Sequence, residues 1–159
     1  MAGVDKKIEV EVPVRTAYNQ WTQFEEFPRF MEGVEEVHQL DDRTLHWKAR
    51  IGGRTEEWTA EIVHQQPDQS IAWRHTRGAV NSGVVVFAPM DAERTRVTLA
   101  LEYDPRGFIE KVGDILGVVS RRVEGDLERF KQFVEERASE TGAWRGEIHP
   151  ADPHPPGQH

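Results

Sequence analysis

The apolar residues of this chain change from a two-residue repeat to a helical repeat, and this change limits the folds it can adopt. From Val34 to Tyr103, apolar and polar side chains alternate in short segments separated by turn residues, which is typical of half-buried antiparallel strands. After Asp104-Pro105-Arg106-Gly107, apolar residues recur with helical spacing from Phe108 to about Ala138. Six consecutive strands joined by short turns predict a meander. The long helix carries a stripe that can cover the apolar face of that meander.

The N-terminal part of the chain predicts one more strand and two short helices. Residues 6–13 alternate cleanly and end at Pro13, which indicates a half-buried strand. Helical spacing over residues 17–24 predicts a short amphipathic helix, and residues 27–31 predict a second one after a break near Pro28. The predicted fold is α+β, with a seven-stranded curved antiparallel sheet wrapped on a long C-terminal helix and two short helices after the first strand.

The length of 159 residues suits one domain with a single core. We expect this domain to span residues 6–138. Residues 139–159, SETGAWRGEIHPADPHPPGQH, are rich in proline, glycine and histidine and show little periodicity, which predicts a flexible tail. The histidines of this tail match no metal-ligand spacing, so we expect no metal site there.

Charge and composition disfavour several classes of function. The formal net charge is −8, and an acidic surface repels phosphate backbones, so nucleic-acid binding is not expected. We interpret the basic pair Arg121-Arg122 as part of a solvated helix face. The absence of cysteine excludes disulfides and a thiol nucleophile. No apolar stretch approaches the roughly 20 residues of a membrane span, and residues 1–7 show no signal-peptide pattern, so we expect a cytoplasmic protein.

Five stretches of the chain are similar to a known family. They are IEVEVPV, the segment with Trp21 that runs into FEEFPRFMEGVEEV, the strand pair LHWKARIGGRTEEWTAEI, then IAWRHTRGAVNSGVVVFAP, and the helix DLERFKQFVEER. Together they extend over about residues 6–138. Through them the chain resembles the START-like or SRPBCC superfamily of helix-grip proteins, in particular its polyketide cyclase/dehydrase and coenzyme-Q-binding branch.

The resemblance implies a fold with an internal cavity for a small hydrophobic ligand. Members of the superfamily hold lipids, quinones, polyketides or plant hormones. Some catalyse aromatic ring cyclisation or dehydration, others only bind, and some associate with other proteins. One fold hosts many activities, so the resemblance is specific for the fold and not for the function. It implies no metal and no nucleotide cofactor.

Aromatic side chains are the main candidates for ligand binding. Trp47, Trp58 and Trp73 share the predicted inward parity of neighbouring strands, Tyr103 joins them from the last strand, and Phe30 comes from the short helices. Aromatic residues fill the cores of small domains efficiently, so plain core packing is the alternative. The resemblance raises the hypothesis that they line a pocket.

Three further residues share the inward parity. Gly83 would leave space in a pocket. Asn81 could orient a ligand carbonyl, or it could cap the turn at Gly78. His75 is the candidate catalytic residue, because a neutral imidazole could abstract a proton next to a carbonyl, as cyclisation requires. The alternatives are a histidine at a wet sheet edge or one that binds a backbone carbonyl.

The leading hypothesis is the binding or carriage of a small lipophilic ligand, such as a quinone, lipid or polyketide, between the sheet and the C-terminal helix. The first alternative is a polyketide cyclase or dehydratase, so the sequence leaves open whether the protein is an enzyme. The second is a protein-interaction module with a vestigial cavity. Besides the ligand, a protein partner or a homodimer remains open.

Overall fold

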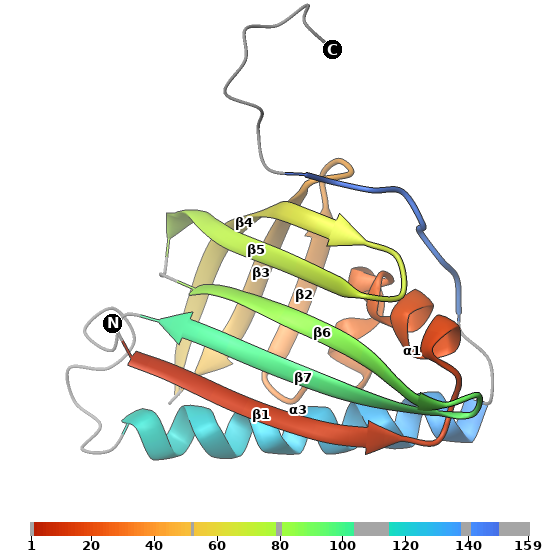
Figure 1. Ribbon diagram of the computed structural model, residues 1–159. Helices are drawn as coiled ribbons and strands as arrows, with labels where there is room; N and C mark the ends of the chain where they lie inside the picture. Colours follow the sequence, from red (N-terminus) through yellow and green to blue (C-terminus); the bar gives the residue numbers. More distant parts are fainter. Residues whose placement is uncertain (1, 52, 79–80, 104–114, 138–140, 150–159) are drawn as a thin grey trace, which may run out of the picture.

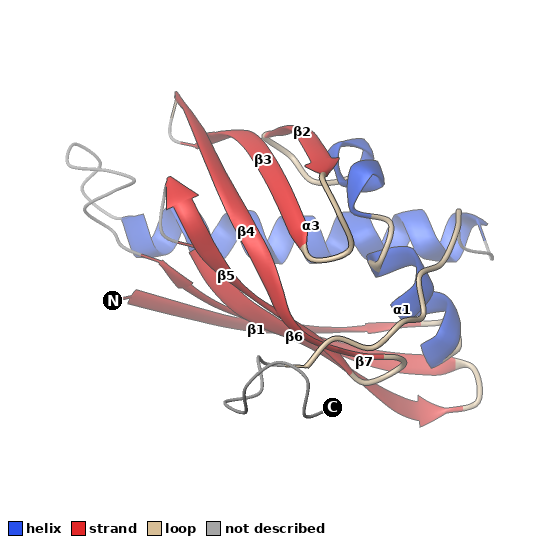
Figure 2. Ribbon diagram, turned by 90° about the horizontal axis from the view of Figure 1, so that it is seen from above, coloured by secondary structure: helices blue, strands red, loops and turns tan. Residues whose placement is uncertain are grey.

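The fold is a curled antiparallel sheet closed on its concave side by one long helix (Figures 1 and 2). The computed structural model describes residues 2–51, 53–78, 81–103, 115–137 and 141–149. The strands are β1 (Ala2–Val10), β2 (Val34–Gln39), β3 (Thr44–Ile51), β4 (Arg54–Gln66), β5 (Ser70–Gly78), β6 (Asn81–Asp91) and β7 (Arg94–Tyr103). The helices are α1 (Val14–Trp21), the 3₁₀ helix η1 (Phe24–Arg29) and α3 (Ile115–Arg137). This arrangement confirms the predicted helix-grip fold.

The strands form one sheet in the order β1-β7-β6-β5-β4-β3-β2. The turn at Gly53, whose φ is +82°, joins β3 to β4 as the sequence predicted, and Ile51 pairs with Arg54. Strand β4 is 13 residues long and its register with β5 shifts twice, between Thr59 and Ala60 and between Ile62 and His64. Such bulges bend a strand and increase its twist. They therefore help the sheet to curl around α3.

The apolar stripe of α3 lies against the concave side of the sheet. Val123, Leu127, Phe130 and Val134 are all buried and belong to the main core, together with residues of the sheet and of α1. Their spacing of four, three and four residues places them on one face of the helix. This part of the predicted stripe is confirmed, whereas residues 108–114 of the expected helix lie outside the described residues. Within the described ranges, no helix is long and apolar enough to cross a membrane.

The N-terminal region differs in detail from the sequence-based prediction. Strand β1 begins at Ala2, four residues before the expected start, because β7 extends to Tyr103 and offers backbone partners as far as Ala2. The first helix ends at Trp21, and the next residues form η1, which includes Phe24 and Pro28. A short 3₁₀ helix tolerates proline because it needs few backbone donors.

Residues 141–149 lie against the domain instead of leaving it. Strand β3 accompanies β4 only as far as Glu61, so none of the described strands pairs with Gln65 on that side. Ile148 takes this place: the amide of Gln65 donates to its carbonyl at 2.7 Å, and the amide of Ile148 donates to the Gln65 carbonyl at 2.9 Å. An unpaired backbone group of a buried residue is costly, and Gln65 is buried.

A charged side chain fixes the same segment to α1 and to the turn after β4. Arg145 donates to Asn19 at 2.6 Å, pairs with Asp68 at 2.8 Å and lies over the ring of Tyr18 at 5.5 Å. These contacts come from α1 and from the turn between β4 and β5. The sequence predicted a tail from residue 139 onward because it shows no periodicity. We propose that the domain extends to about residue 149.

Ile148→Ala should lower the free energy of unfolding by about 2–4 kcal/mol, because the substitution leaves a cavity in the core. Urea denaturation followed by circular dichroism measures this change. Glu147→Ala is the matched control, since among the described residues its exposed side chain pairs only with the exposed His149, and its effect should stay below about 0.5 kcal/mol. If the Ile148→Ala protein unfolds at the wild-type urea concentration, residues 141–149 do not stabilise the domain.

Candidate functional site

A cavity of about 160 Å³ lies between the concave face of the sheet, η1 and α3. Its walls are mainly apolar, and the charged residues on them are Glu32, Arg122 and Asp126. The other lining residues are Trp21, Phe24, Phe27, Met31, Val34, Leu45, Trp47, Ala49, Trp58, Ile62, Ile71, Trp73, Leu99, Leu101, Val123 and Leu127. A volume of this size resembles the apolar cavity of roughly 150 Å³ that is known to hold one benzene ring.

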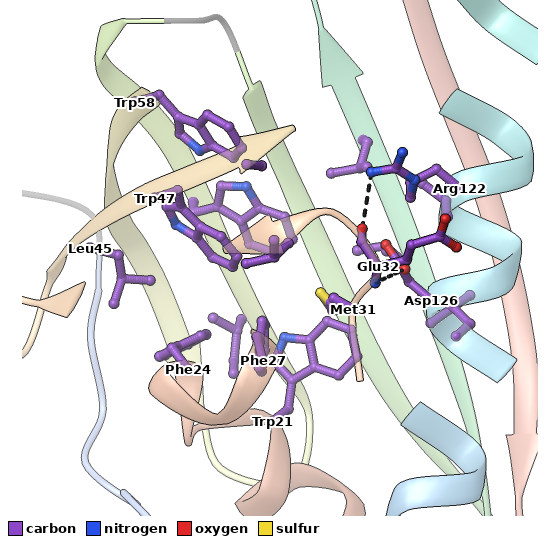
Figure 3. A pocket seen from close by; sticks show the side chains of 18 of the residues that line it. Trp21, Phe24, Phe27, Met31, Glu32, Leu45, Trp47, Trp58, Arg122 and Asp126 are labelled. Atoms are coloured by element: carbon purple, nitrogen blue, oxygen red, sulfur yellow. Dashed lines mark hydrogen bonds between the residues drawn. The ribbon is translucent and has the colours of Figure 1, made fainter. Parts of the chain in front are cut away.

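Tryptophans from three neighbouring strands line the cavity, and Figure 3 shows two of them, Trp47 and Trp58. Trp47 on β3 and Trp58 on β4 are register partners, and their rings stack at 5.9 Å with an interplanar angle of 6°. Trp73 on β5 packs against the small cluster formed by Trp58, Ala49 and Ala60. Trp47, Trp58 and Trp73 all line the cavity, so a large indole area borders it. Flat indole rings suit a planar aromatic or conjugated ligand.

Aromatic residues of α1 and η1 close one end of the cavity. Trp21 meets Phe27 edge to face at 5.4 Å and also packs against Phe130 of α3 at 5.0 Å. Phe24 packs against Phe27 in the same manner at 5.4 Å. The rings of Trp21, Phe24 and Phe27 each contact both the cavity and the core. The end wall is therefore rigid, because moving any ring would disturb helix packing.

The polar corner of the cavity lies on α3, across from Trp47 and Trp58 (Figure 3). Arg122 and Asp126 are four residues apart and so lie on the same helix face. Both bind the backbone of Glu32, in the segment between η1 and β2. Nη1 of Arg122 donates to the Glu32 carbonyl at 3.0 Å and to the Arg50 carbonyl at 3.2 Å. Oδ1 of Asp126 accepts the Glu32 amide at 3.1 Å.

A second arginine completes this corner. Arg129 donates to Oδ1 of Asp126 at 2.5 Å, to the Phe30 carbonyl at 2.8 Å, and pairs with the Glu32 carboxylate at 3.5 Å. Arg122, Asp126 and Arg129 therefore fasten the segment from Phe30 to Gly33 onto α3. This segment forms part of the cavity wall, since Met31 and Glu32 line it.

Burial raises the pKa of Asp126 from its ordinary value of 3.8 to about 6. The hydrogen bond and charge of Arg129, the Glu32 amide and the charge of Arg122 act in the opposite direction, but they do not offset the loss of solvation. A carboxyl group with this pKa can take up or release a proton near neutral pH.

Gly33 is required by the position of Arg122. Its φ is +84°, a conformation that side chains rarely adopt, and an added Cβ would overlap the Arg122 guanidinium and lie 2.7 Å from the Arg50 carbonyl oxygen. The glycine thus leaves the space in which the arginine reaches both backbone carbonyls.

The structure brings only part of the predicted site together. Trp47, Trp58 and Trp73 line the cavity. Gly83 is not a lining residue; it lies behind Trp73, where an added Cβ would be 2.8 Å from the indole. Phe30 is in the core, where its ring packs on Phe130 and Phe133 at 5.6 and 5.1 Å.

Asn81 and Tyr103 are register partners at the ends of β6 and β7. Their side chains lie outside the described part of the structure, so their role in ligand binding stays a prediction.

His75 is half-buried and is not among the residues that line the cavity. It pairs across the sheet with the buried Ala60, and opposite residues share a face. Its Nδ1 is buried and has no hydrogen-bond partner in the described residues. The catalytic role of His75 therefore stays a prediction.

The polar corner was not predicted from the sequence. The expectation that Arg121-Arg122 is a solvated pair is wrong for Arg122: only Arg121 is exposed, whereas Arg122 is half-buried and lines the cavity. The spacing of the charged residues on the C-terminal helix could have indicated this corner. Arg122, Asp126 and Arg129 follow each other at intervals of four and three residues, in a row directly beside the buried stripe of α3. Opposite charges in such a row predict a charged network at the edge of the core.

Comparison with known proteins agrees with this fold and cavity. A sequence model described as "Polyketide cyclase / dehydrase and lipid transport" matches residues 10–132. The chain belongs to this family. It is 51% identical to a protein of Streptomyces lincolnensis known as the uncharacterized 17.2 kDa protein of the melC2-rnhH intergenic region, over 93% of this chain and 99% of that protein.

Two solved structures show the same architecture at low sequence identity. One is the Zhui aromatase/cyclase of Streptomyces sp. R1128, with a TM-score of 0.73 and 18% identity over 90% of this chain and 99% of that one. The other is a START superfamily protein of Mycobacterium smegmatis, with a TM-score of 0.67 and 16% identity over 86% of this chain and 96% of that one. The chain thus has the START-like, or SRPBCC, fold that was predicted from the resemblance of its sequence to this superfamily.

The pKa of Asp126 predicts how stability depends on pH. The pKa of Asp126 is about 6 in the folded protein, and its ordinary value of 3.8 applies to the unfolded chain. Between pH 3.8 and 6 the folded protein therefore binds more protons than the unfolded one. The free energy of unfolding should therefore fall as pH rises from about 4 to 6, by on the order of 2 kcal/mol from this residue.

Urea denaturation of the wild type and Asp126→Asn between pH 4 and 7 isolates this contribution. The stability of the variant relative to the wild type should grow with pH, since asparagine does not ionise. A constant difference between the two proteins would contradict the raised pKa.

Gly33→Ala should destabilise the protein more than Gly53→Ala. The two glycines have nearly the same φ, +84° and +82°, but no described atom lies within 4 Å of a Cβ added at Gly53. The shared backbone strain costs about 1–3 kcal/mol. At Gly33 alone, the clash with the Arg50 carbonyl, together with the displacement of the Arg122 guanidinium, should add about 1–3 kcal/mol. Thermal unfolding of both variants measures the difference, and equal losses would show that the space beside Gly33 is open.

Proposed function

We propose that this protein binds and carries a small lipophilic ligand in the cavity between its sheet and α3. The observation that supports this proposal is an apolar cavity of about 160 Å³ walled by tryptophans from three strands, with its charged groups at one corner. Burying apolar ligand surface there contributes about 25 cal/mol per Å², and the charged corner fixes the orientation of the ligand. The cytoplasmic location and a protein partner or homodimer stay predictions from the sequence.

The cavity favours ligand binding over an interaction module with a vestigial pocket. A vestigial pocket would be filled by side chains, whereas a cavity of about 160 Å³ stays open between the aromatic residues that line it. The rigid end wall also supports a preformed site, because ligand binding would not have to order it first.

The second candidate function is that of a polyketide cyclase or dehydratase. Asp126 supports it, because a carboxyl group with a pKa of about 6 on a cavity wall can serve as an acid or a base. The structural similarity to the Zhui aromatase/cyclase points in the same direction. Against it, Oδ1 of Asp126 already holds Arg129 and the Glu32 amide, and His75 does not line the cavity. We therefore place carriage first.

Trp58→Ala and Trp73→Ala should each weaken the binding of 2-naphthamide, a neutral bicyclic aromatic probe, by about tenfold, because each removes a flat wall of the cavity. Isothermal titration calorimetry measures the affinity. Trp144→Ala is the matched control, since Trp144 does not line the cavity, and it should bind the probe like the wild type. If both cavity variants fold and bind with wild-type affinity, the ligand site is not in this cavity.

An activity assay on a poly-β-ketone substrate distinguishes the carrier from the enzyme. A carrier gives no product with the wild type. A cyclase gives product, and Asp126→Asn should then lower turnover while binding persists. His75→Ala tests the role predicted from the sequence in the same assay, and product formation that survives it would remove His75 from the mechanism.

A further inference from the structure

Arg122 is a cation on the cavity wall that no carboxylate neutralises by direct contact in the described structure. Its hydrogen bonds both come from Nη1 and end on the neutral carbonyls of Glu32 and Arg50. Its Nε and Nη2 make no hydrogen bond to any other described residue. A guanidinium group has five N–H donors in a fixed fork, which suits the two oxygens of an acidic group. The backbone carbonyls and Gly33 hold this fork in place before any ligand binds.

The nearby carboxylates are bound to a different arginine. Asp126 and Glu32 both pair with Arg129, at 2.5 and 3.5 Å. Arg129 does not line the cavity, whereas Arg122 does. Among the described charged residues that line the cavity, Arg122 is thus the cation, and it has no carboxylate in direct contact.

The size of the cavity suits a compact ligand. Its volume of about 160 Å³ is close to that of an apolar cavity known to hold one aromatic ring. The stacked pair Trp47 and Trp58 offers flat surfaces opposite Arg122 (Figure 3).

We propose that the ligand is a compact aromatic acid, with one or two fused rings against the tryptophans and its carboxylate on the free donors of Arg122. This inference rests on the proposed function, because it assigns the chemistry of the same cavity.

The protonation of Asp126 should modulate this binding. The charged groups around Asp126 in the described structure are Arg122 and Arg129 on α3 and Glu32 on the segment before β2. When Asp126 is ionised, its charge repels an anionic ligand on the neighbouring Arg122. When it is neutral, the repulsion disappears. An aromatic acid should thus bind more tightly below the pKa of Asp126 than above it.

The test compares 2-naphthoate with its neutral isostere 2-naphthamide by calorimetry on the wild type, Arg122→Gln and Arg122→Lys. The wild type should prefer the naphthoate, and Arg122→Gln should weaken naphthoate binding by about tenfold or more, the effect of losing a hydrogen bond to a charged group. Binding of the amide should change less than about threefold. Arg122→Lys, which keeps the charge, should recover part of the naphthoate affinity. Thermal unfolding establishes that each variant is folded.

A second measurement does not depend on changing Arg122. From pH 7.5 to 5.5, wild-type affinity for 2-naphthoate should rise several-fold, while Asp126→Asn should bind it with equal affinity at both values. Affinity for the amide should not change with pH in either protein.

The outcomes separate this inference from the proposed function. If both probes bind with equal affinity, and neither affinity changes with Arg122→Gln or with pH, the cavity binds ligands but Arg122 does not bind an acid group. If Arg122→Gln weakens both probes equally, the arginine only supports the cavity wall, and the inference is overturned. If neither probe binds to the wild type, both the inference and the proposed function fail.

Discussion

The apolar concave face of the sheet has to be covered, and the row of buried residues on α3 provides that cover. Val123, Leu127, Phe130 and Val134 pack into the core that the sheet and α1 share. A sheet with one apolar face is not stable alone in water. The curl of the sheet, its bulges and the placement of α1 and η1 all serve to bring this face and this helix together. The cavity exists because the contact between the concave face of the sheet and α3 is incomplete.

The incompleteness has an identifiable origin in side-chain size. Trp47 and Trp58 on neighbouring strands stack on one another, and the small residues Ala49 and Ala60 pack beside Trp58. Close-packed interiors seldom tolerate a cavity, because every void loses contacts. On the helix side, Arg122 and Asp126 line the cavity beside Val123 and Leu127 of the apolar stripe. The result is a site with flat apolar walls and one charged corner.

Much of the fold could be predicted from the sequence, but little of the charged corner. Alternation in the strands and the stripe of α3 depend on local spacing, so they indicated the sheet, the helix and the inward tryptophans correctly. Arg122 and Asp126 acquire their role from Gly33 and Glu32, which are about 90 residues away in the chain. The docking of residues 141–149 likewise depends on the overhang of β4 past β3, a difference in strand length that no local pattern reveals. Phe30, a candidate from the predicted short helices, packs on Phe130 of α3 and does not line the cavity.

The position of α3 after the sheet in the chain has a consequence for biosynthesis. Ribosomes synthesise a protein from its N-terminus, so all seven strands leave the ribosome before the helix that covers them. Until residues 115–137 have been made, the nascent sheet exposes an aromatic face to solvent or to other nascent chains. Exposed apolar surface and incomplete sheets are the species that aggregate and that chaperones bind. Folding of this protein should therefore finish only after translation has passed α3, with the edge of β4 completed last by Ile148.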